Sequence, residues 1–397
     1  SRPLLTGYDF TAKVVDTKKT GTKYFKGEKR YEDVGDKIEY VFDGKKMFFP
    51  RIYSTESDHR RLYERWLDLK PGEKPTTADN WKFFFKYQIG HMYVRYLLWN
   101  FVGRQNDEQG MGDIRDGNWL SGIGFVDSAF LGPQSNLPEA IKNHPSRNTM
   151  FFIPLLIALL GAIFQFMSNK RYFGVVTLLF LYLGVMIIIQ GNSPPVEPRE
   201  RDYIFAGSFW AFNIWLGLGV VAIFDMLGGL LKNQQARSIL AIGIAALAPL
   251  LMGAQNWNNH DRSNRFAARD FAANYLNSCA PNSIIFTQGD NDTYPLWYAQ
   301  EVEGIRRDVR VVNLSLLGVD WYIDQLRRKV NDADPVPMTL TPEKYRGTER
   351  DIVPFVAKQD IPADAYVSLD NVMKFITSES SSAKVTGSGR PMNYLPT

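Results

Sequence analysis

The stretch FFIPLLIALLGAIFQFM, residues 151–167, is the first of four apolar runs. The others are FGVVTLLFLYLGVMIIIQ at 173–190, a run at 209–231 whose single charged residue is Asp225, and a run at 239–253. A helix crosses a bilayer with about 20 apolar residues, and about 17 is the lower limit. Soluble cores also contain apolar helices, but four such runs in close succession favour a membrane. We therefore expect a polytopic α-helical membrane protein.

Short loops join the runs in pairs and set the expected topology. One hairpin loop holds Lys170 and Arg171, and the other is bounded by Lys232 and Arg237. Lys and Arg in short loops favour the cytoplasmic side. We expect these two loops in the cytoplasm of a bacterium. The loop 191–203 and both long flanks should then lie on the extracytoplasmic side of the inner membrane.

The composition argues against several kinds of site. The chain has 397 residues and a net charge of +4, and its single cysteine, Cys279, cannot form an intramolecular disulfide. Four scattered histidines argue against a His-based zinc site. No Walker loop, dinucleotide fingerprint or nucleophile elbow occurs. The cofactor is therefore unknown, and we expect no nucleic-acid partner.

The flank before the first run divides into two segments. Residues 1–79 are expected to be β-rich, with a hairpin where Asp-Gly (43–44) separates KIEYVF (37–42) from KKMFFPRIY (45–53). Residues 80–148 begin with an aromatic and basic stretch and continue as a long Gly-rich loop. The aromatic stretch fits an amphipathic helix in the membrane interface or one packed on a soluble domain.

The membrane region is expected at 149–254, and residues 255–397 form the second extracytoplasmic domain. Helices and strands alternate in it: helix 262–276, strand 283–288, helix 292–303, strand 307–316 and helix 320–330. Such alternation favours a parallel α/β unit.

The segment GDNDTYPLWY, residues 289–298, follows the first strand of this unit. Ligands of open α/β sheets bind at the carboxyl ends of the strands, so Asp290, Asn291 and Asp292 are candidate binding residues. The two carboxylates also suit a divalent cation. They suit equally a capping role at the start of the next helix. All three interpretations stay open, and no metal ligand is assigned.

The Pro-rich loop PPVEPRERDY contains a second set of candidates. Arg199 and Arg201 each present a fork of donors that matches a phosphate, and Asp202 lies beside them. These residues could bind the phosphate of a lipid-linked substrate. Alternatively, the arginines form ion pairs with Glu197, Glu200 and Asp202 that seat the loop on its neighbours.

Three stretches resemble bacterial polytopic membrane proteins related to protein O-mannosyltransferases. They are FVGRQND at 101–107, PRERDYIFAGS at 198–208 and GDNDTYPLWYAQEVEGIRRDVRVVNLSLL at 289–317. The resemblance spans nearly the whole chain, and the third stretch is its most specific part. The first stretch contains Arg104 and Asp107, for which substrate binding and ion pairing are again the alternatives.

The resemblance implies a lipid-donor glycosyltransferase whose catalytic carboxylate lies in an early loop of a longer bundle. That loop would precede Ser1, so we expect a central portion of a longer polypeptide, and the catalytic residues remain unknown. The expected function is transfer of a sugar, mannose, from a polyprenyl phosphate to exported proteins. The alternative is a non-catalytic membrane partner in an envelope export or assembly complex. The expected partners are membrane lipid, the polyprenyl-phosphate sugar donor, the exported acceptor protein and envelope complex subunits.

Overall fold

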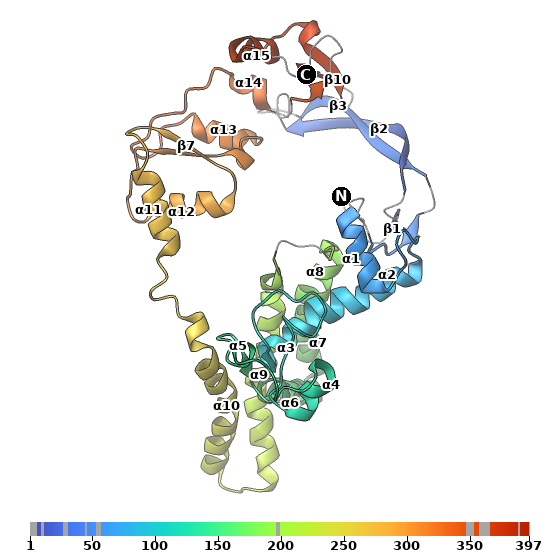
Figure 1. Ribbon diagram of the computed structural model, residues 1–397. Helices are drawn as coiled ribbons and strands as arrows, with labels where there is room; N and C mark the ends of the chain where they lie inside the picture. The colour runs from blue at the N-terminus through green and yellow to red at the C-terminus, as the bar shows by residue number, and fades with distance from the viewer. Residues whose placement is uncertain are drawn as a thin grey trace. The chain divides into compact units, whose positions relative to one another are not determined.

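The chain divides into two compact units. The computed structural model describes residues 6–8, 12–26, 31–43, 46–52, 57–195, 199–346, 353–356, 366–387 and 390–396. Unit 1 comprises Ser1–Val15 and Phe42–Asp261, and unit 2 comprises Asp16–Val41 and Arg262–Thr397 (Figure 1).

Unit 1 is mainly helical. Its α-helices are α1 (Ser57–Leu67), α2 (Thr77–Phe83), α3 (Arg95–Phe101), α4 (Gly124–Leu131), α5 (Glu139–Lys142), α6 (Ile153–Ser168), α7 (Lys170–Leu181), α8 (Ile187–Gly191), α9 (Ala206–Met226) and α10 (Gln234–His260). Two π-helical segments, η1 (Phe84–Val94) and η2 (Tyr182–Met186), and two 3-10 segments, η3 (Asp202–Phe205) and η4 (Leu227–Gly229), continue them. Two short antiparallel pairs join β1 (Thr6–Gly7) to β4 (Met47–Phe48) and β5 (Gly103–Arg104) to β6 (Asn148–Thr149).

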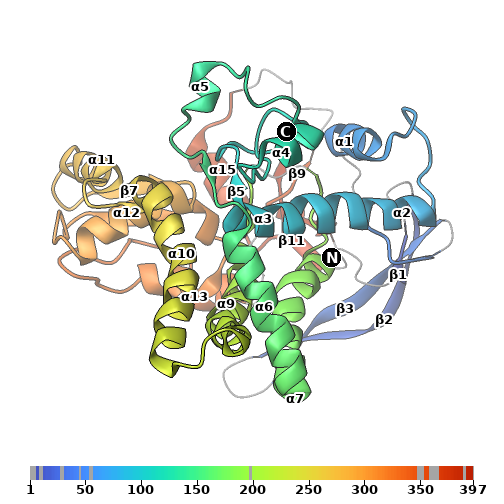
Figure 2. The same ribbon diagram turned by 90° about the horizontal axis from the view of Figure 1, so that it is seen from below.

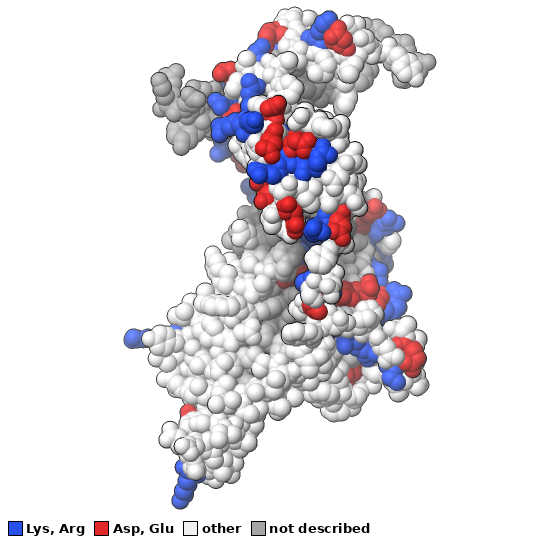
Figure 3. Space-filling model, turned by 90° about the vertical axis from the view of Figure 1, so that its left-hand side faces the viewer, with Lys and Arg blue, Asp and Glu red and all other residues white. Residues whose placement is uncertain are grey.

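Among the described residues, three helical stretches of unit 1 are long and apolar enough to cross a membrane. They are Lys170–Gly191, Asp202–Gly229 and Gln234–His260. The first predicted run forms α6, whose 16 residues make it shorter than these stretches. On the face that Figure 3 presents, the helices of unit 1 carry a broad surface without charged side chains. Membrane association is therefore indicated by three helices rather than the four predicted.

Helix α9 packs against α6, α7 and α10 (Figure 2). The contact with α6 is very close: a Cβ at Gly161 would clash with the carbonyl oxygen of Trp215, and one at Gly219 would clash with Ile157. Small residues allow this approach of two helix backbones in a membrane. The Trp215 Nε1 also donates to Gln165 Oε1 across the contact, at 2.8 Å.

The segments α2, η1 and α3 form one continuous helical stretch. Its Phe84, Tyr93 and Phe101 are buried in the same apolar cluster as residues of α6, α7, α8 and α9. The Tyr93 hydroxyl lies 2.6 Å from the hydroxyl of Ser208 on α9. The aromatic stretch predicted at 80–102 is thus helical, and it packs on the helices that contain the candidate spans.

The predicted hairpin at Asp43 is wrong, because the strand before the turn and the strand after it pair with other strands. The strand β3 (Tyr31–Phe42) pairs with β2 (Val14–Lys26), whereas β4 pairs with β1. Position 44 of the turn lies outside the described residues. The Asp-Gly signal is local, but β2 offers β3 a partner 13 residues long, and a longer ladder contributes more cross-strand pairs.

Unit 2 contains the predicted α/β region. Its later elements are α11 (Ala267–Asn277), β7 (Ile284–Thr287), α12 (Asp290–Glu301), β8 (Arg310–Asn313), η5 (Leu314–Leu316), α13 (Asp320–Leu326), α14 (Pro342–Tyr345), β9 (Phe355–Val356), α15 (Leu369–Ile376), η7 (Ser381–Ala383), β10 (Lys384–Gly387), β11 (Arg390–Asn393) and β12 (Leu395–Pro396). Strands β10 and β11 pair in antiparallel fashion, and β9 and β12 pair in parallel.

The parallel pairing of β7 with β8 confirms the prediction for this region. Leu276 of α11 and Leu296 of α12 pack with Val311 of β8 in one buried cluster. Val312 packs in a second cluster with Tyr322 of α13. Because neighbouring strand residues point to opposite faces, helices cover both faces of this small sheet.

Candidate functional site

A buried ion pair anchors the loop that precedes the span Asp202–Gly229. The carboxylate of Glu200 accepts from Arg95 at 2.9 Å and from the backbone N–H of Gly110 at 3.0 Å. Arg95 is itself buried and also donates to the carbonyl oxygens of His91 and Gly117. Because Glu200 is held by Arg95, it acts as the anchor of the loop on α3.

A pocket of about 300 Å³ opens beside this anchored loop, at the start of the span. It is lined by Tyr96, Asn100, Asp202, Tyr203, Ala206, Phe209, Trp210 and Asn213. Asn100, Asp202 and Asn213 provide hydrogen-bonding groups, whereas Tyr203 and Trp210 are 58% and 62% exposed. A few polar groups among aromatic walls are typical of a small-molecule site.

The pocket contains a phenol that stays neutral. Burial, together with the negative charge of Asp202, raises the pKa of Tyr96 to about 12. The hydroxyl of Tyr96 therefore remains a hydrogen-bond donor at neutral pH. Asp202 also accepts the backbone N–H of Tyr203 at 2.8 Å, which orients its carboxylate at the start of η3.

Arg199 and Arg201 are exposed on the loop before the pocket. The guanidinium of Arg199 lies 6.0 Å from the ring centre of Tyr203, a pocket residue. Of the acids predicted as their partners, Glu200 pairs with Arg95, Glu197 lies outside the described residues, and Asp202 lines the pocket. Arg201 directly precedes the pocket residue Asp202 in the chain.

Arg104 and Asp107 lie on the loop that follows α3 and are tied to the segment before α6. Arg104 donates through Nε to the carbonyl oxygen of Ser146 at 2.7 Å, and Asp107 accepts from the Ser146 hydroxyl at 2.8 Å. Burial lowers the pKa of Arg104, while its electrostatic interactions with Asp107 and Tyr96 oppose this shift. These contacts hold Arg104 close to the pocket residue Tyr96.

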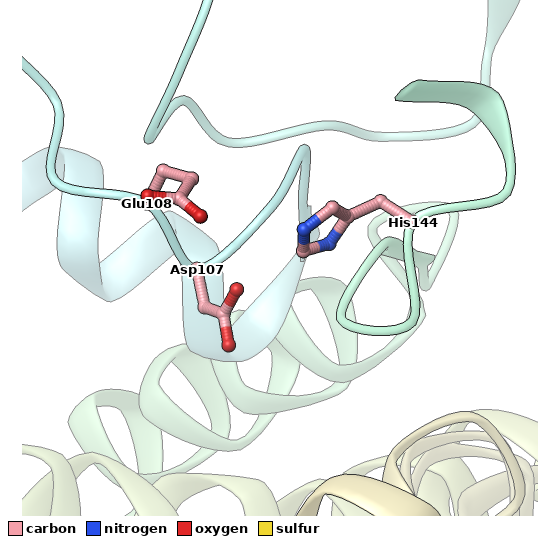
Figure 4. Close-up of side chains that lie close together, drawn as sticks. All are labelled: Asp107, Glu108 and His144. Atoms are coloured by element: carbon pink, nitrogen blue, oxygen red, sulfur yellow. The ribbon is translucent and has the colours of Figure 1, made fainter. Parts of the chain in front are cut away.

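Asp107 also belongs to a cluster with Glu108 and His144 (Figure 4). One potential ligand atom from each residue lies within 4.8 Å of the others. Carboxylate and imidazole suit divalent metal ions, but both carboxylates are exposed, and Ser146 bonds to Asp107 and His144. We assign no metal to this cluster. His144 is distant from the two acids in the sequence, so the spacing of these residues did not indicate the cluster.

The remaining candidates belong to unit 2. The carboxylate of Asp292 accepts from the backbone N–H groups of Gln288 and Gly289, at 2.8 and 2.9 Å. These bonds lower the pKa of Asp292 and cap the start of α12. Asp290 and Asn291 are exposed on the first turn, where Asp290 accepts the backbone N–H of Asn291.

The structure thus divides the predicted site residues between two units. Arg104, Asp107, Arg199, Arg201 and Asp202 lie in unit 1, and the three residues 290–292 lie in unit 2. Sequence reasoning missed Tyr96, Asn100, Trp210 and Asn213 because they lie inside helices. The available signal was spacing: Tyr96 and Asn100 are four residues apart on one helical face, as are Asp202 and Ala206.

Two family models match parts of the chain. Residues 268–397 match a family described as TMEM260-associated domain 2, and residues 1–85 match a family of unknown function, DUF8416. No solved structure matches the chain.

One curated relative carries a name with an activity. The chain is 30% identical over 125 residues to the protein O-mannosyl-transferase TMEM260 of Mus musculus. This match covers 29% of the chain and only 18% of the mouse protein. Part of this chain is therefore related to a protein O-mannosyl-transferase, in a protein with three candidate membrane helices.

Proposed function

We propose that this chain is part of a membrane glycosyltransferase, similar to protein O-mannosyltransferases, that moves a sugar from a polyprenyl phosphate to exported proteins. The observation that carries the proposal is the pocket at the start of the span Asp202–Gly229, with Arg199 and Arg201 exposed beside it. The partial similarity to the mouse transferase supports the same class.

The pocket offers chemistry for each part of such a donor. The apolar surface of the span suits the polyprenyl tail, because it continues from the pocket into a helix of bilayer length. Arg199 and Arg201 would both bind the phosphate, each through its planar fork of donors. Asn100 and Asn213 would bond the sugar hydroxyls, and the exposed ring of Trp210 would cover an apolar face of the sugar.

The transfer also needs a carboxylate that takes the proton from a Ser or Thr hydroxyl of the acceptor. We assign this role to no residue of the chain and propose that it lies upstream of Ser1. The proposed location is the bacterial inner membrane, with the pocket on the extracytoplasmic side and Lys170 and Lys232 on the cytoplasmic side, in line with the distribution of basic residues.

The test is a glycoprotein blot of envelope fractions from a deletion strain that carries either the natural gene or a variant. Arg199→Lys and Arg201→Lys should each reduce glycosylation at least ten-fold at unchanged protein abundance, because Lys lacks the planar fork of donors. Arg171→Lys in the hairpin loop is the matched control and should have no effect. If the arginines only form exposed ion pairs, the Lys variants should keep normal glycosylation, since such pairs contribute about 0–1 kcal/mol.

A second pair of variants tests the aromatic wall. Trp210→Ala should reduce transfer, whereas Trp257→Ala, at a residue that is 75% exposed on α10 and outside the pocket lining, should not. If the deletion strain, lacking any paralogue, shows an unchanged blot, the glycosyltransferase proposal is refuted. A disturbed export complex in that strain would then favour the non-catalytic membrane partner.

A further inference from the structure

Unit 2 contains a separate pocket that the proposed function does not use. It has a volume of about 370 Å³ and lies along β8, between the end of α12 and α13. Its lining includes Trp297, Glu301, Arg307, Arg310 and Trp321. The volume lies near the lower end of the range for small-molecule sites, about 300–1,000 Å³.

The pocket is lined by a buried cation with unused hydrogen-bonding capacity. Arg310, the first residue of β8, is only 7% exposed, and its Nη2 donates to the carbonyl oxygen of Gln325 at 2.9 Å. Its Nη1 is buried and has no hydrogen-bond partner. No carboxylate among the described residues forms an ion pair with it, in contrast to Arg306 of the same unit, which pairs with Asp308 at 2.8 Å. A buried charge that no carboxylate neutralises is costly, so an anionic ligand would stabilise the charge of Arg310.

The rim of the pocket is already ordered by hydrogen bonds. Arg307 donates to Asn331 Oδ1 at 2.6 Å, and Asn331 donates to Glu301 Oε1 at 2.7 Å. The side-chain amide of Asn331 thus holds Glu301 at the rim. Arg307, also at the rim, adds a second positive charge to the pocket. Burial lowers the pKa of Arg310 and the Tyr322 phenol raises it, but a guanidinium remains charged at neutral pH.

The walls of the pocket suit a flat, apolar ring. Trp297 is partly buried and stacks on Tyr294, with ring centres 5.5 Å apart. Trp321, on α13, is 57% exposed. Val311 of β8 also lines the pocket.

The free edge of β8 is closed to an added peptide strand. Among the described residues, β8 pairs only with β7. On the other edge, Gln300 Nε2 donates to the carbonyl oxygen of Val309 at 2.7 Å, and the Tyr322 hydroxyl accepts the N–H of Asn313 at 2.8 Å. These two hydrogen bonds use the backbone carbonyl of Val309 and the backbone N–H of Asn313, which an added peptide strand would need for pairing. A small ligand therefore fits the pocket better than a peptide.

We propose that this pocket binds a small ligand with one phosphate or carboxylate group next to a flat ring. The oxyanion pairs with Arg310 at the base and Arg307 at the rim, and the ring lies against Trp297 and Trp321. The site is independent of the proposed glycosyltransferase activity, because it lies in unit 2 and shares no residue with the pocket of unit 1.

Isothermal titration of the full chain in detergent tests the proposal with phenyl phosphate, benzoate and neutral benzyl alcohol as probes. At least one anionic probe should bind at a single site, and benzyl alcohol should bind at least ten-fold more weakly. The stronger of the two anions identifies the group that the site prefers. If neither anion binds saturably at concentrations up to about 10 mM, above the usual range for specific small ligands, the proposal is wrong.

Variants localise the site. Arg310→Met should weaken binding of the preferred anion at least ten-fold and should not lower the unfolding midpoint, because it removes a buried charge that no carboxylate neutralises. Arg328→Met removes an equal charge from a residue outside the lining and should leave binding unchanged. Trp321→Ala, at an exposed position, should weaken phenyl phosphate or benzoate but not inorganic phosphate or acetate. Equal losses in the Arg310 and Arg328 variants would show a general charge effect and overturn the proposal.

Discussion

At the scale of single residues, Asp292 shows how backbone contacts determine a charge state. Its two oxygens accept N–H groups from Gln288 and Gly289, which favours the ionised form and lowers the pKa of Asp292. The folded pKa is therefore below the unfolded one. The stabilisation is complete above the ordinary carboxyl pKa of about 4 and is lost as the pH falls through the lowered folded value.

Removal of this cap should be measurable in the thermal unfolding of the purified protein. At pH 7, Asp292→Ala should lower the midpoint by a few degrees, and Asp292→Asn should lower it less, because Asn retains one acceptor oxygen. The difference between the natural protein and the Ala variant should shrink below about pH 4.

Asp290→Ala provides the control, because the Asp290 carboxylate accepts the backbone N–H of its neighbour Asn291, whereas Asp292 accepts those of Gln288 and Gly289. A midpoint that rises with added divalent cations, and no longer rises in an Asp290→Asn, Asp292→Asn double variant, would instead establish a cation site at the start of α12.

At the scale of elements, the close contact of α6 with α9 depends on two glycines. A methyl group at Gly161 would meet the Trp215 carbonyl oxygen and lie 2.6 Å from the backbone nitrogen of Gly219. Both obstacles are backbone atoms, which cannot rotate away as a side chain does. Any residue larger than glycine must therefore push the two helices apart.

Gly161→Ala should destabilise the protein by about 1–3 kcal/mol, the usual cost of overpacking a tight contact. The measurement is the unfolding midpoint of the detergent-solubilised protein in a denaturing-detergent titration. Gly217→Ala is the matched control on α9, because a Cβ there meets nothing within 4 Å. Equal destabilisation by both changes would point to helix propensity in general rather than to the contact.

At the scale of the whole molecule, the membrane topology remains a prediction with a direct test. Single cysteines are introduced at Lys170, Gln235 and Ser135, all exposed positions of unit 1, in a Cys279→Ala background. With cytoplasmic hairpin loops, an impermeant thiol reagent applied to intact cells should label Ser135→Cys and spare the other two. Permeabilised cells, in which all three should react, provide the control. Protection at 135 with labelling at 170 and 235 would invert the topology.

Local patterns in the sequence were sufficient for much of the secondary structure. Hydropathy is a property of neighbouring residues, so the runs at 173–190, 209–231 and 239–253 correspond to helices of bilayer length. The alternation of helical and strand-like segments likewise predicted the parallel pairing of β7 with β8. The candidate cap at Asp292 was also visible, as an acid at the start of a predicted helix.

Contacts between segments that are distant in the sequence could not be predicted from such local patterns. The partner of β3 was predicted wrongly, because a turn signal describes only four residues. The pocket of unit 1 joins Asn100 of α3 to Asn213 of α9, and the pocket of unit 2 is lined by Arg310, whose buried Nη1 has no hydrogen-bond partner. Neither arrangement follows from periodicity.

The sequence by itself determined the apolar helices, the α/β region and the chemistry available on each loop. Only the tertiary structure decided which groups meet: Glu200 pairs with Arg95, 105 residues earlier, and the guanidinium of Arg199 lies 6.0 Å from the ring centre of the pocket residue Tyr203. The physical reason is that hydropathy and helix period depend on neighbouring residues. Partner choice depends instead on how whole helices pack, and in unit 1 that packing depends on close contacts such as Gly161 against Trp215.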